Sequence, residues 1–205
     1  MHPEFSLHKD VIYLNHAAVA PWPTRTADAV RRFAEENASR GAQYYPRWMQ
    51  VEQALRKQLA QLIHAPASAD IALLKSTSEG LSLIAGGLDW AAGDNIVSFD
   101  GEFPSNRIPW EALSPQGVTL RLAPLGAFDD PESRLFARCD DRTRLLSVSS
   151  VQYATGLRLD LERIGAFCRE RGILFCVDAI QSLGALPFDV QAYGADFVVA
   201  DGHKW

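Results

Sequence analysis

From residue 70 onward, short runs of apolar residues alternate with stretches in which apolar positions recur every three or four residues. The first pattern is typical of buried strands and the second of amphipathic helices. The predicted strands are 71–74, 95–99, 118–122, 144–150, 173–177 and 196–200, and the predicted helices are 78–88, 104–113 and 160–172. Nearly continuous apolar strands that alternate with helices predict an α/β fold, in which a mostly parallel sheet carries helices on both faces.

The chain before residue 70 follows a different pattern. Residues 1–22 are predicted to form an irregular N-terminal arm, and residues 23–66 to form two helices. The first helix has Thr24 as a candidate N-cap and ends at Gly41, and the second begins near Pro46. Apolar residues recur at helical spacing at Ala27, Val30, Phe33 and Ala34, and the buried face of the second helix is marked by Val51, Leu55, Leu59 and Leu62. Residues 70–205 then form the α/β sheet.

Composition narrows the class of protein further. The 205 residues are 47% hydrophobic and 22% charged, which is ordinary for a globular protein with a sizeable core. The formal net charge of -5, with no basic run, argues against nucleic acid or an anionic membrane as a partner. None of the three cysteines forms a CxxC pair, so neither a disulfide framework nor a metal site is indicated. No signal-peptide core or membrane span is present, and we expect a cytoplasmic protein.

Polar segments follow almost every predicted strand. They are "KSTSEG", "DGEFPSN", "SVQYATG", "DAIQ" and "DGHK". In open parallel sheets, ligands bind beyond the carboxyl ends of the strands. In the first segment, Thr77 and Ser78 stand where a strand becomes a helix, so that hydroxyls and free N–H groups there are suited to a phosphate. Ordinary N-capping explains the same residues equally well, and neither a P-loop nor a GxGxxG fingerprint is present.

Asp178 and Lys204 each follow an apolar strand directly and are 26 positions apart. If the two strands are parallel neighbours, both side chains open into one crevice. An acid there can keep a heterocyclic nitrogen protonated, and a desolvated lysine becomes a nucleophile. Together with a phosphate site, these are the parts that a pyridoxal 5'-phosphate (PLP) enzyme requires. Taken singly, Asp178 is as well explained as a turn cap and Lys204 as a solvated side chain.

These motifs resemble the class V aminotransferase family of PLP-dependent enzymes, which has fold type I. The resemblance runs from "YLNHAA" to the last residue, and its most specific part is "VDAIQSLGALPFDV" followed by "ADFVVADGHKW". It implies a PLP-binding large domain and an amino-acid substrate undergoing transamination, lyase or epimerase chemistry. It also implies a homodimer. The chain is most similar to the branch with isopenicillin N epimerase-like proteins, selenocysteine lyases and kynureninases.

The resemblance also implies roles for individual residues. Lys204 would form the Schiff base with PLP and Asp178 would pair with the ring nitrogen. The predicted cofactor contacts are Thr77 and Ser78 at the phosphate, with help from Asp201 or His203, Phe103 stacked on the ring, and Gln181 or Gln152 near the phenolic oxygen. Asn15 and His16 would lie near the substrate entrance. The alternatives are a core role for Phe103, an orienting role for His203, and anchoring of the N-terminal arm by Asn15 and His16.

Several positions depart from the family pattern. Desulfurases place a histidine over the cofactor ring, and an aromatic ring such as Phe103 cannot transfer protons, so we rank desulfurase activity lower. Ile180 is bulkier than the usual residue under the ring, and Asp201 stands where relatives have Ser or Thr. The family's second half returns a strand to the sheet and then builds a smaller C-terminal domain. That domain supplies the arginine for the substrate carboxylate and the catalytic cysteine of desulfurases, and it lies outside these 205 residues.

Two other hypotheses compete with an enzyme. The first is a catalytically inactive or partner-dependent fragment, because a sheet without later strands leaves an exposed edge and an uncovered apolar face. The second is a nucleotide-binding domain, which rests on fold analogy alone and lacks the glycine fingerprint.

Overall fold

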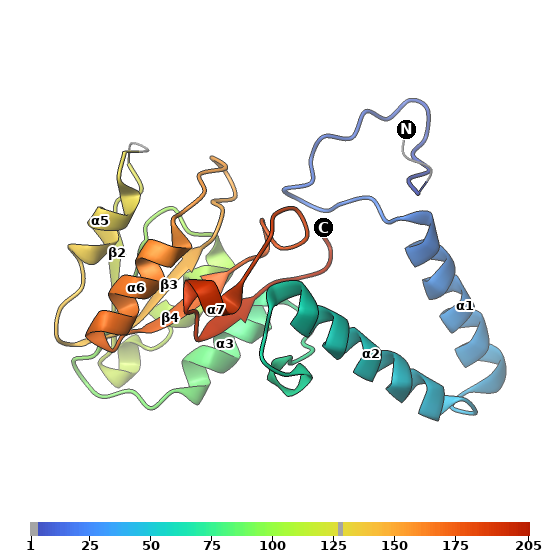
Figure 1. The fold of residues 1–205 in the computed structure, drawn as a ribbon, viewed down its shortest axis with the longest axis horizontal. Coiled ribbons are helices and arrows are strands. Elements are labelled where there is room, and N and C mark those ends of the chain that lie inside the picture. Colours follow the sequence, from blue (N-terminus) through green and yellow to red (C-terminus); the bar gives the residue numbers. More distant parts are fainter. Residues whose placement is uncertain (1–3, 127–128) are drawn as a thin grey trace.

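A five-stranded parallel sheet forms the centre of this computed structural model, which describes residues 4–126 and 129–205 (Figure 1). The strand order is β2-β1-β3-β4-β5, and every neighbouring pair is parallel. The strands are β1 Asn95–Phe99, β2 Thr119–Ala123, β3 Thr143–Ser149, β4 Leu174–Asp178 and β5 Phe197–Val199. The predicted α/β class is therefore confirmed. The first three residues of the predicted N-terminal arm lie outside the described residues.

Helices cover both faces of the sheet (Figure 1). On one face lie α5 Pro131–Phe136, α6 Leu161–Arg171 and α7 Val190–Tyr193, and on the other lie α3 Thr77–Gly87 and α4 Ile108–Glu111. Close packing between α6 and α7 requires a glycine, because a Cβ atom on Gly165 would lie 1.7 Å from the Tyr193 carbonyl oxygen. The predicted arrangement of helices on both faces is confirmed.

The strands bury both of their faces by simple alternation. Ile96 and Leu145 point to the core under α3 and α4, whereas Val97 and Leu146 point to the core under α5 and α6. All four side chains are fully buried. Because successive side chains of a strand point to opposite faces, a strand covered on both sides must be apolar throughout. This is why the strands appear in the sequence as continuous apolar runs.

The predicted helix boundaries hold where capping residues define them. The Asp160 side chain accepts a hydrogen bond from the Arg163 N–H, and Gly172 ends α6 with a left-handed φ of 66°. The predicted helix over 104–113 is wrong, because the segment consists of a 3-10 turn, Pro104–Asn106, and the single turn of α4. Two prolines start these two turns, and a proline has no N–H with which to continue a helical ladder.

Residues 71–74 do not form the predicted strand. A strand exists only with a hydrogen-bonded neighbour, and no described strand pairs with this segment. β5 is an edge strand of the sheet. α3 packs closely on β5, because a Cβ atom on Gly80 would lie 2.7 Å from Val199 Cγ1. Leu73 and Leu74 are exposed. The apolar run therefore has strand composition but no strand partner.

The two helices before the sheet project away from it as a pair (Figure 1). α1 spans Thr24–Arg40 and α2 spans Tyr45–Ile63, and we call them the helix pair. The predicted burial of the apolar face of α2 is wrong: Val51, Leu55 and Leu62 are exposed and Leu59 is half-buried. Thr24 is the first helical residue rather than the N-cap. Neither helix lies across the sheet, so most of their apolar surface has nothing to cover it within the described chain. The end of α2 is the exception, because Ala60 is buried and Ile63 packs against the core.

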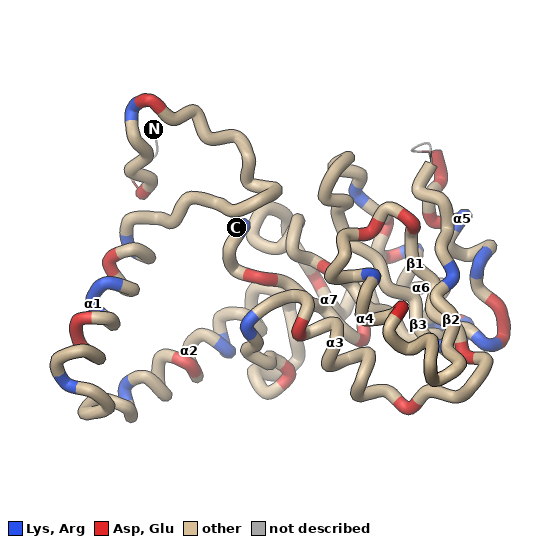
Figure 2. Tube along the Cα trace, turned by 180° about the vertical axis from the view of Figure 1, so that it is seen from behind, with Lys and Arg blue, Asp and Glu red and all other residues tan. Residues whose placement is uncertain are grey.

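A polar contact joins the helix pair to the sheet unit, residues 70–205. His64, which ends α2 in a left-handed conformation, places its Nδ1 2.8 Å from Asp189 Oδ2. The Gln191 side-chain amide donates to the His64 carbonyl oxygen at 2.6 Å. Figure 2 shows acidic and basic residues interspersed along α1 and α2 rather than gathered by sign. Within the described residues, no helix combines the length and apolarity needed to cross a membrane.

Candidate active site

A cavity of about 520 Å³ lies beyond the carboxyl ends of β3, β4 and β5. Nine of the eleven contact residues named from the sequence line it, namely Asn15, Thr77, Ser78, Phe103, Asp178, Gln181, Asp201, His203 and Lys204. The other two, His16 and Gln152, are not among its lining residues. Because parallel strands end at the same edge of a sheet, segments far apart in the sequence meet at this point.

Asp178 is the last residue of β4 and is almost completely buried. Its Oδ1 accepts a hydrogen bond from the Ile180 N–H at 3.0 Å, while its Oδ2 is buried without a partner among the described residues. Burial raises the pKa of Asp178 to about 7; the Ile180 N–H opposes this shift, the nearby Glu102 adds to it, and the amine of Lys204 opposes it. An unpaired buried carboxylate oxygen is costly, and this one is available to a ligand that donates a hydrogen bond.

Lys204 lies on the loop after β5 with only 8% of its surface exposed. Burial lowers the pKa of its amine, and the charges of Asp178 and Asp201 partly oppose that effect. Nζ lies 6.0 Å from the centroid of the Phe103 ring, and the described chain places no carboxylate within ion-pair distance of it. An amine with a lowered pKa has a larger neutral fraction near neutral pH, which a nucleophile requires.

At the start of α3, the structure shows which residue caps the helix and which hydroxyls are left for a phosphate. The cap is Ser76, whose Oγ accepts a hydrogen bond from the Glu79 N–H at 3.2 Å. Thr77 is not used for capping, and its Oγ1 is buried without a partner in the described chain. Ser78 is exposed and also lines the cavity. A free hydroxyl at the N-terminus of an eleven-residue helix is suited to an anion.

The two glutamines differ in what their side chains do. Gln181 lines the cavity, and its Nε2 donates to the Ala17 carbonyl oxygen at 3.1 Å. Gln152 donates to the Gly101 carbonyl oxygen at 2.8 Å, and its Oε1 accepts from the Ala154 N–H at 2.7 Å. The side chain of Gln152 therefore stabilises its own loop, and the geometry gives no support to its predicted contact with a cofactor.

The N-terminal arm lies against the loop that carries Lys204. The Ala20 N–H donates to the His203 carbonyl oxygen at 2.8 Å, and the rings of His16 and Trp205 stack with centroids 5.4 Å apart. His203 also pairs with Asp201, with 3.0 Å between Nδ1 and Oδ1. Asn15 faces the cavity, whereas the ring of His16 is used for anchoring. The arm thus forms one wall of the site, and the anchoring alternative for His16 has direct support.

The sequence did not identify every residue of the cavity. Ser105, Ser149 and Tyr153 also line it, and the Tyr153 ring meets the Phe103 ring edge-on at 5.1 Å. Ser105 and Tyr153 stand in the polar segments that follow β1 and β3, and Ser149 is the last residue of β3. Position after a strand was therefore a usable signal, but it did not show which side chains in each segment turn inward.

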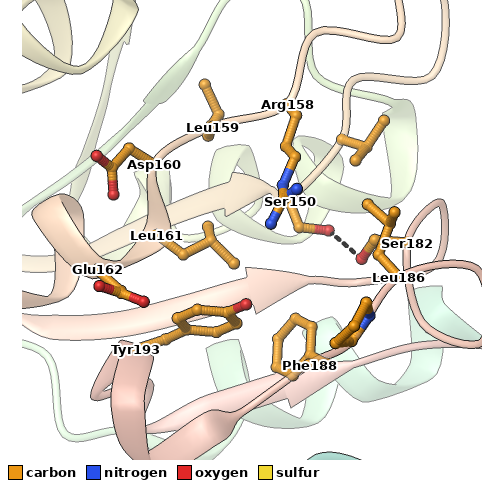
Figure 3. Close-up of a pocket in the computed structure, with 12 residues that line it drawn as sticks. Ser150, Arg158, Leu159, Asp160, Leu161, Glu162, Ser182, Leu186, Phe188 and Tyr193 are labelled. Carbon is orange, nitrogen blue, oxygen red and sulfur yellow. Dashed lines mark hydrogen bonds between the residues drawn. The ribbon is translucent and has the colours of Figure 1, made fainter.

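A second hollow, of about 360 Å³, lies between the loop after β3 and the loop before α7 (Figure 3). Arg158, Tyr193, Ser150 and Ser182 are among its lining residues. The hydroxyls of Ser150 and Ser182 bond each other at 2.6 Å. No buried unpaired polar side-chain atom occurs here in the described chain, whereas Thr77 and Asp178 each leave one in the first cavity. The first cavity is therefore the better candidate for a polar ligand.

Comparison with known proteins agrees with this geometry. The family model of class-V aminotransferases matches residues 12–205. The chain belongs to that family. It is 36% identical to a probable cysteine desulfurase of Methanothermobacter thermautotrophicus, over 98% of this chain and 51% of the relative. It is 34% identical to a cysteine desulfurase of Yersinia pestis, over 95% of this chain and 50% of the relative. The chain spans about half the length of these curated relatives.

Solved structures confirm the PLP-enzyme fold of type I. The cysteine desulfurase CsdA of Escherichia coli superposes with a TM-score of 0.83 at 28% identity, over 94% of this chain and 50% of CsdA. A mutant of C-DES with glycine covalently linked to its PLP cofactor superposes with a TM-score of 0.90 at 26% identity, over 96% of this chain and 54% of that protein. Another structure describes C-DES as a cystine C–S lyase in complex with cysteine persulfide.

PLP is the cofactor of this family, and the residues of the cavity fit it. The unpaired Oδ2 of Asp178 is suited to a protonated ring nitrogen, and the unpaired hydroxyl of Thr77 to a phosphate. The presence of Phe103 led us to rank desulfurase activity lower, whereas these two curated relatives are named as cysteine desulfurases.

Proposed function

We propose that this chain forms the PLP site of an enzyme that acts on the α-carbon of an amino acid, with Lys204 as the residue that carries the cofactor. The main support is that the buried amine of Lys204 and the unpaired carboxylate oxygen of Asp178 face one cavity. When bound, PLP supplies an electron sink for the bonds at the α-carbon of the substrate. The protein supplies binding, orientation and proton transfer.

The proposed roles follow from the surroundings of each side chain. Asp178 would be held ionised by a cationic ring nitrogen, which reverses the effect of burial on its pKa. Thr77 and Ser78 would bind the phosphate at the start of α3, and Phe103 would stack on the ring. Lys204 would hold or move the proton at the α-carbon, because its lowered pKa suits both states.

The remaining contacts are proposed from the lining of the cavity. Gln181 and His203 line the cavity and would contact the cofactor or its linkage to Lys204. Asn15 would contact the substrate, with His16 holding the arm in place through Trp205. The Phe103 ring cannot act as an acid or base, so we assign proton transfer to Lys204.

For the substrate, we propose a sulfur-containing amino acid as the first class to test. The support is the naming of the relatives as cysteine desulfurases and of C-DES as a cystine C–S lyase. Transamination and epimerisation of other amino acids are the alternatives within the family. Sulfide or a persulfide released from cysteine or cystine would identify carbon–sulfur cleavage. A 2-oxo acid that keeps the substrate's side chain would identify transamination, and the D-amino acid would identify epimerisation.

Cofactor binding is tested by adding PLP to the purified protein and following a yellow absorbance band. Borohydride should fix the cofactor onto a tryptic peptide that contains Lys204, as seen by mass spectrometry. Lys204→Ala should lose the fixed adduct completely. Lys75→Ala is the matched control, because the Lys75 side chain is 82% exposed and lies outside the cavity. Labelling of other lysines, with none at Lys204, would contradict the proposal.

A second candidate is a chain that binds PLP but needs a partner for catalysis, including a second copy of itself as in the proposed homodimer. It is favoured by the exposed apolar residues of the helix pair and by the unpaired segment 71–74. Sedimentation and hydrogen exchange distinguish the two candidates. A protected monomer that turns over an amino acid would exclude the partner-dependent candidate.

A further inference from the structure

A buried carboxyl group outside the proposed cofactor contacts lies directly beside Phe103. Glu102 follows β1 and is 7% exposed. Its Oε1 accepts a hydrogen bond from the Ser149 N–H at 2.8 Å. Its Oε2 accepts from Ser149 Oγ at 2.5 Å and from Asn106 Nδ2 at 3.1 Å. Two of these three hydrogen bonds join the loop after β1 to the end of β3, and the third closes the loop on itself.

The contacts continue into a second tier. Asn106 Oδ1 accepts from Ser147 Oγ at 2.6 Å and from Trp110 Nε1 at 3.1 Å. Asn106, Ser147 and Trp110 are fully buried. None of these side chains leaves a buried polar atom without a partner. A buried network that is fully satisfied is rigid, because any displacement leaves polar groups unpaired in a low-dielectric interior.

Phe103 needs such support because core packing does not hold it. Its side chain is 46% exposed, and its ring contacts the similarly exposed Tyr153. The backbone on both sides of it is fixed: Glu102 precedes it, and the Phe103 carbonyl oxygen accepts from the Asn106 N–H at 2.8 Å. The direction of the ring therefore depends on the loop 102–106 more than on its side-chain neighbours.

We propose that Glu102 is a positioning residue that, through Ser149 and Asn106, holds Phe103 in place against the face of the bound cofactor. The proposal rests on the proposed function, since it assigns Phe103 to the cofactor. Fixing a stacking ring before the ligand arrives avoids the cost of ordering it on binding. Glu102 itself does not line the cavity, so it acts on Phe103 through the loop and not by contact with the cofactor. Glu102→Gln removes the charge that Glu102 presents to Asp178 and keeps the shape, which separates the two effects.

The test compares Glu102→Ala with wild-type protein that has first been shown to bind PLP. Glu102→Ala should weaken PLP binding about tenfold and reduce the circular dichroism of the cofactor band, which reports a fixed asymmetric surrounding. In the apoprotein, the amides of residues 101–103, 105 and 106 should exchange with deuterium faster. Glu102→Gln retains the shape and one acceptor, and should recover most of the cofactor signal.

Glu132→Ala is the matched control. Glu132 is also a buried glutamate, and its Oε1 accepts from the Asp160 N–H at 2.8 Å, but it does not line the cavity. It should lose stability and keep wild-type PLP affinity and dichroism. If Glu102→Ala does not fold, Ser149→Ala removes one of the three bonds and should give a smaller change of the same kind. The proposal for Glu102 would be overturned if the folded Glu102 or Ser149 variants kept wild-type PLP affinity, dichroism and loop exchange. If the wild-type protein did not bind PLP, the proposed function would be overturned instead.

Discussion

The sheet unit and the helix pair carry the same kind of apolar pattern but bury it to very different extents. Phe175 and Ile164, in β4 and α6, are fully buried, whereas Phe33 and Val51, in α1 and α2, are 51% and 62% exposed. The difference lies in the partners. Every strand and helix of the sheet unit covers another, while α1 and α2 project away from the sheet (Figure 1). An amphipathic pattern thus predicts that one face of a helix needs a partner, but it does not show whether this chain supplies that partner.

The largest effect should come from matched truncations in the two regions. Phe175→Ala removes a fully buried ring and should lower the free energy of unfolding by about 3–5 kcal/mol. Phe33→Ala should cost about 1 kcal/mol or less, because that ring mainly keeps one edge-on contact with Trp48 at 5.1 Å. Urea unfolding of both variants measures the difference. Equal losses would show that Phe33 is buried in solution.

A second difference concerns pH. The pKa of Asp178 is about 7 in the folded chain against an ordinary value of 3.8, so the folded state binds the proton more tightly. The contribution of Asp178 to the free energy of unfolding is therefore fully present below pH 3.8. It falls by on the order of 4 kcal/mol as the pH rises to 7. Asp178→Asn should remove that fall in the unfolding free energy of the apoprotein. Asp10→Asn, at an 85% exposed side chain in the N-terminal arm, should leave it unchanged.

A third comparison uses two helix caps. The Asp189 carboxylate caps α7 and contacts His64 at the end of α2, while Asp160 caps α6 and has no contact with the helix pair. Each Asp→Ala change should cost about 1 kcal/mol. Only Asp189→Ala should also speed amide exchange in α2, because it breaks the side-chain tie between Asp189 and His64. Faster exchange of α2 in both variants would show that the tie is not specific.

The smallest effect on stability is expected for Val51→Ser. At an exposed position, the change should stay within about 0.5 kcal/mol. If α2 meets a second copy of the chain, the same variant should weaken self-association in sedimentation experiments at unchanged stability. The Lys57→Ser variant controls for a change at another exposed position of the same helix. Unchanged association in Val51→Ser would argue against α2 as the contact surface.

Much of the site was readable from residue order. Asp178 and Lys204 were predicted to share a crevice, and both line the cavity. That prediction succeeded because parallel strands bring their carboxyl ends together whatever the details of packing. Gln152 lies outside the lining of the cavity because its loop uses the whole amide, and its contact with the cofactor stays a prediction without geometric support. Glu102 was overlooked because nothing local reveals that Ser149 and Asn106 converge on it.

The sequence by itself determined the elements whose signals are local. These are the continuous apolar strands, the Asp160 and Gly172 caps of α6, and the polar residues that follow every strand except β2. Only the tertiary structure decided that residues 71–74 remain unpaired, that the apolar face of α2 stays exposed, and that Glu102 holds the loop of Phe103. The reason is physical: a cap or an alternation acts within a few residues, whereas strand pairing, burial and polar networks depend on which distant segments meet.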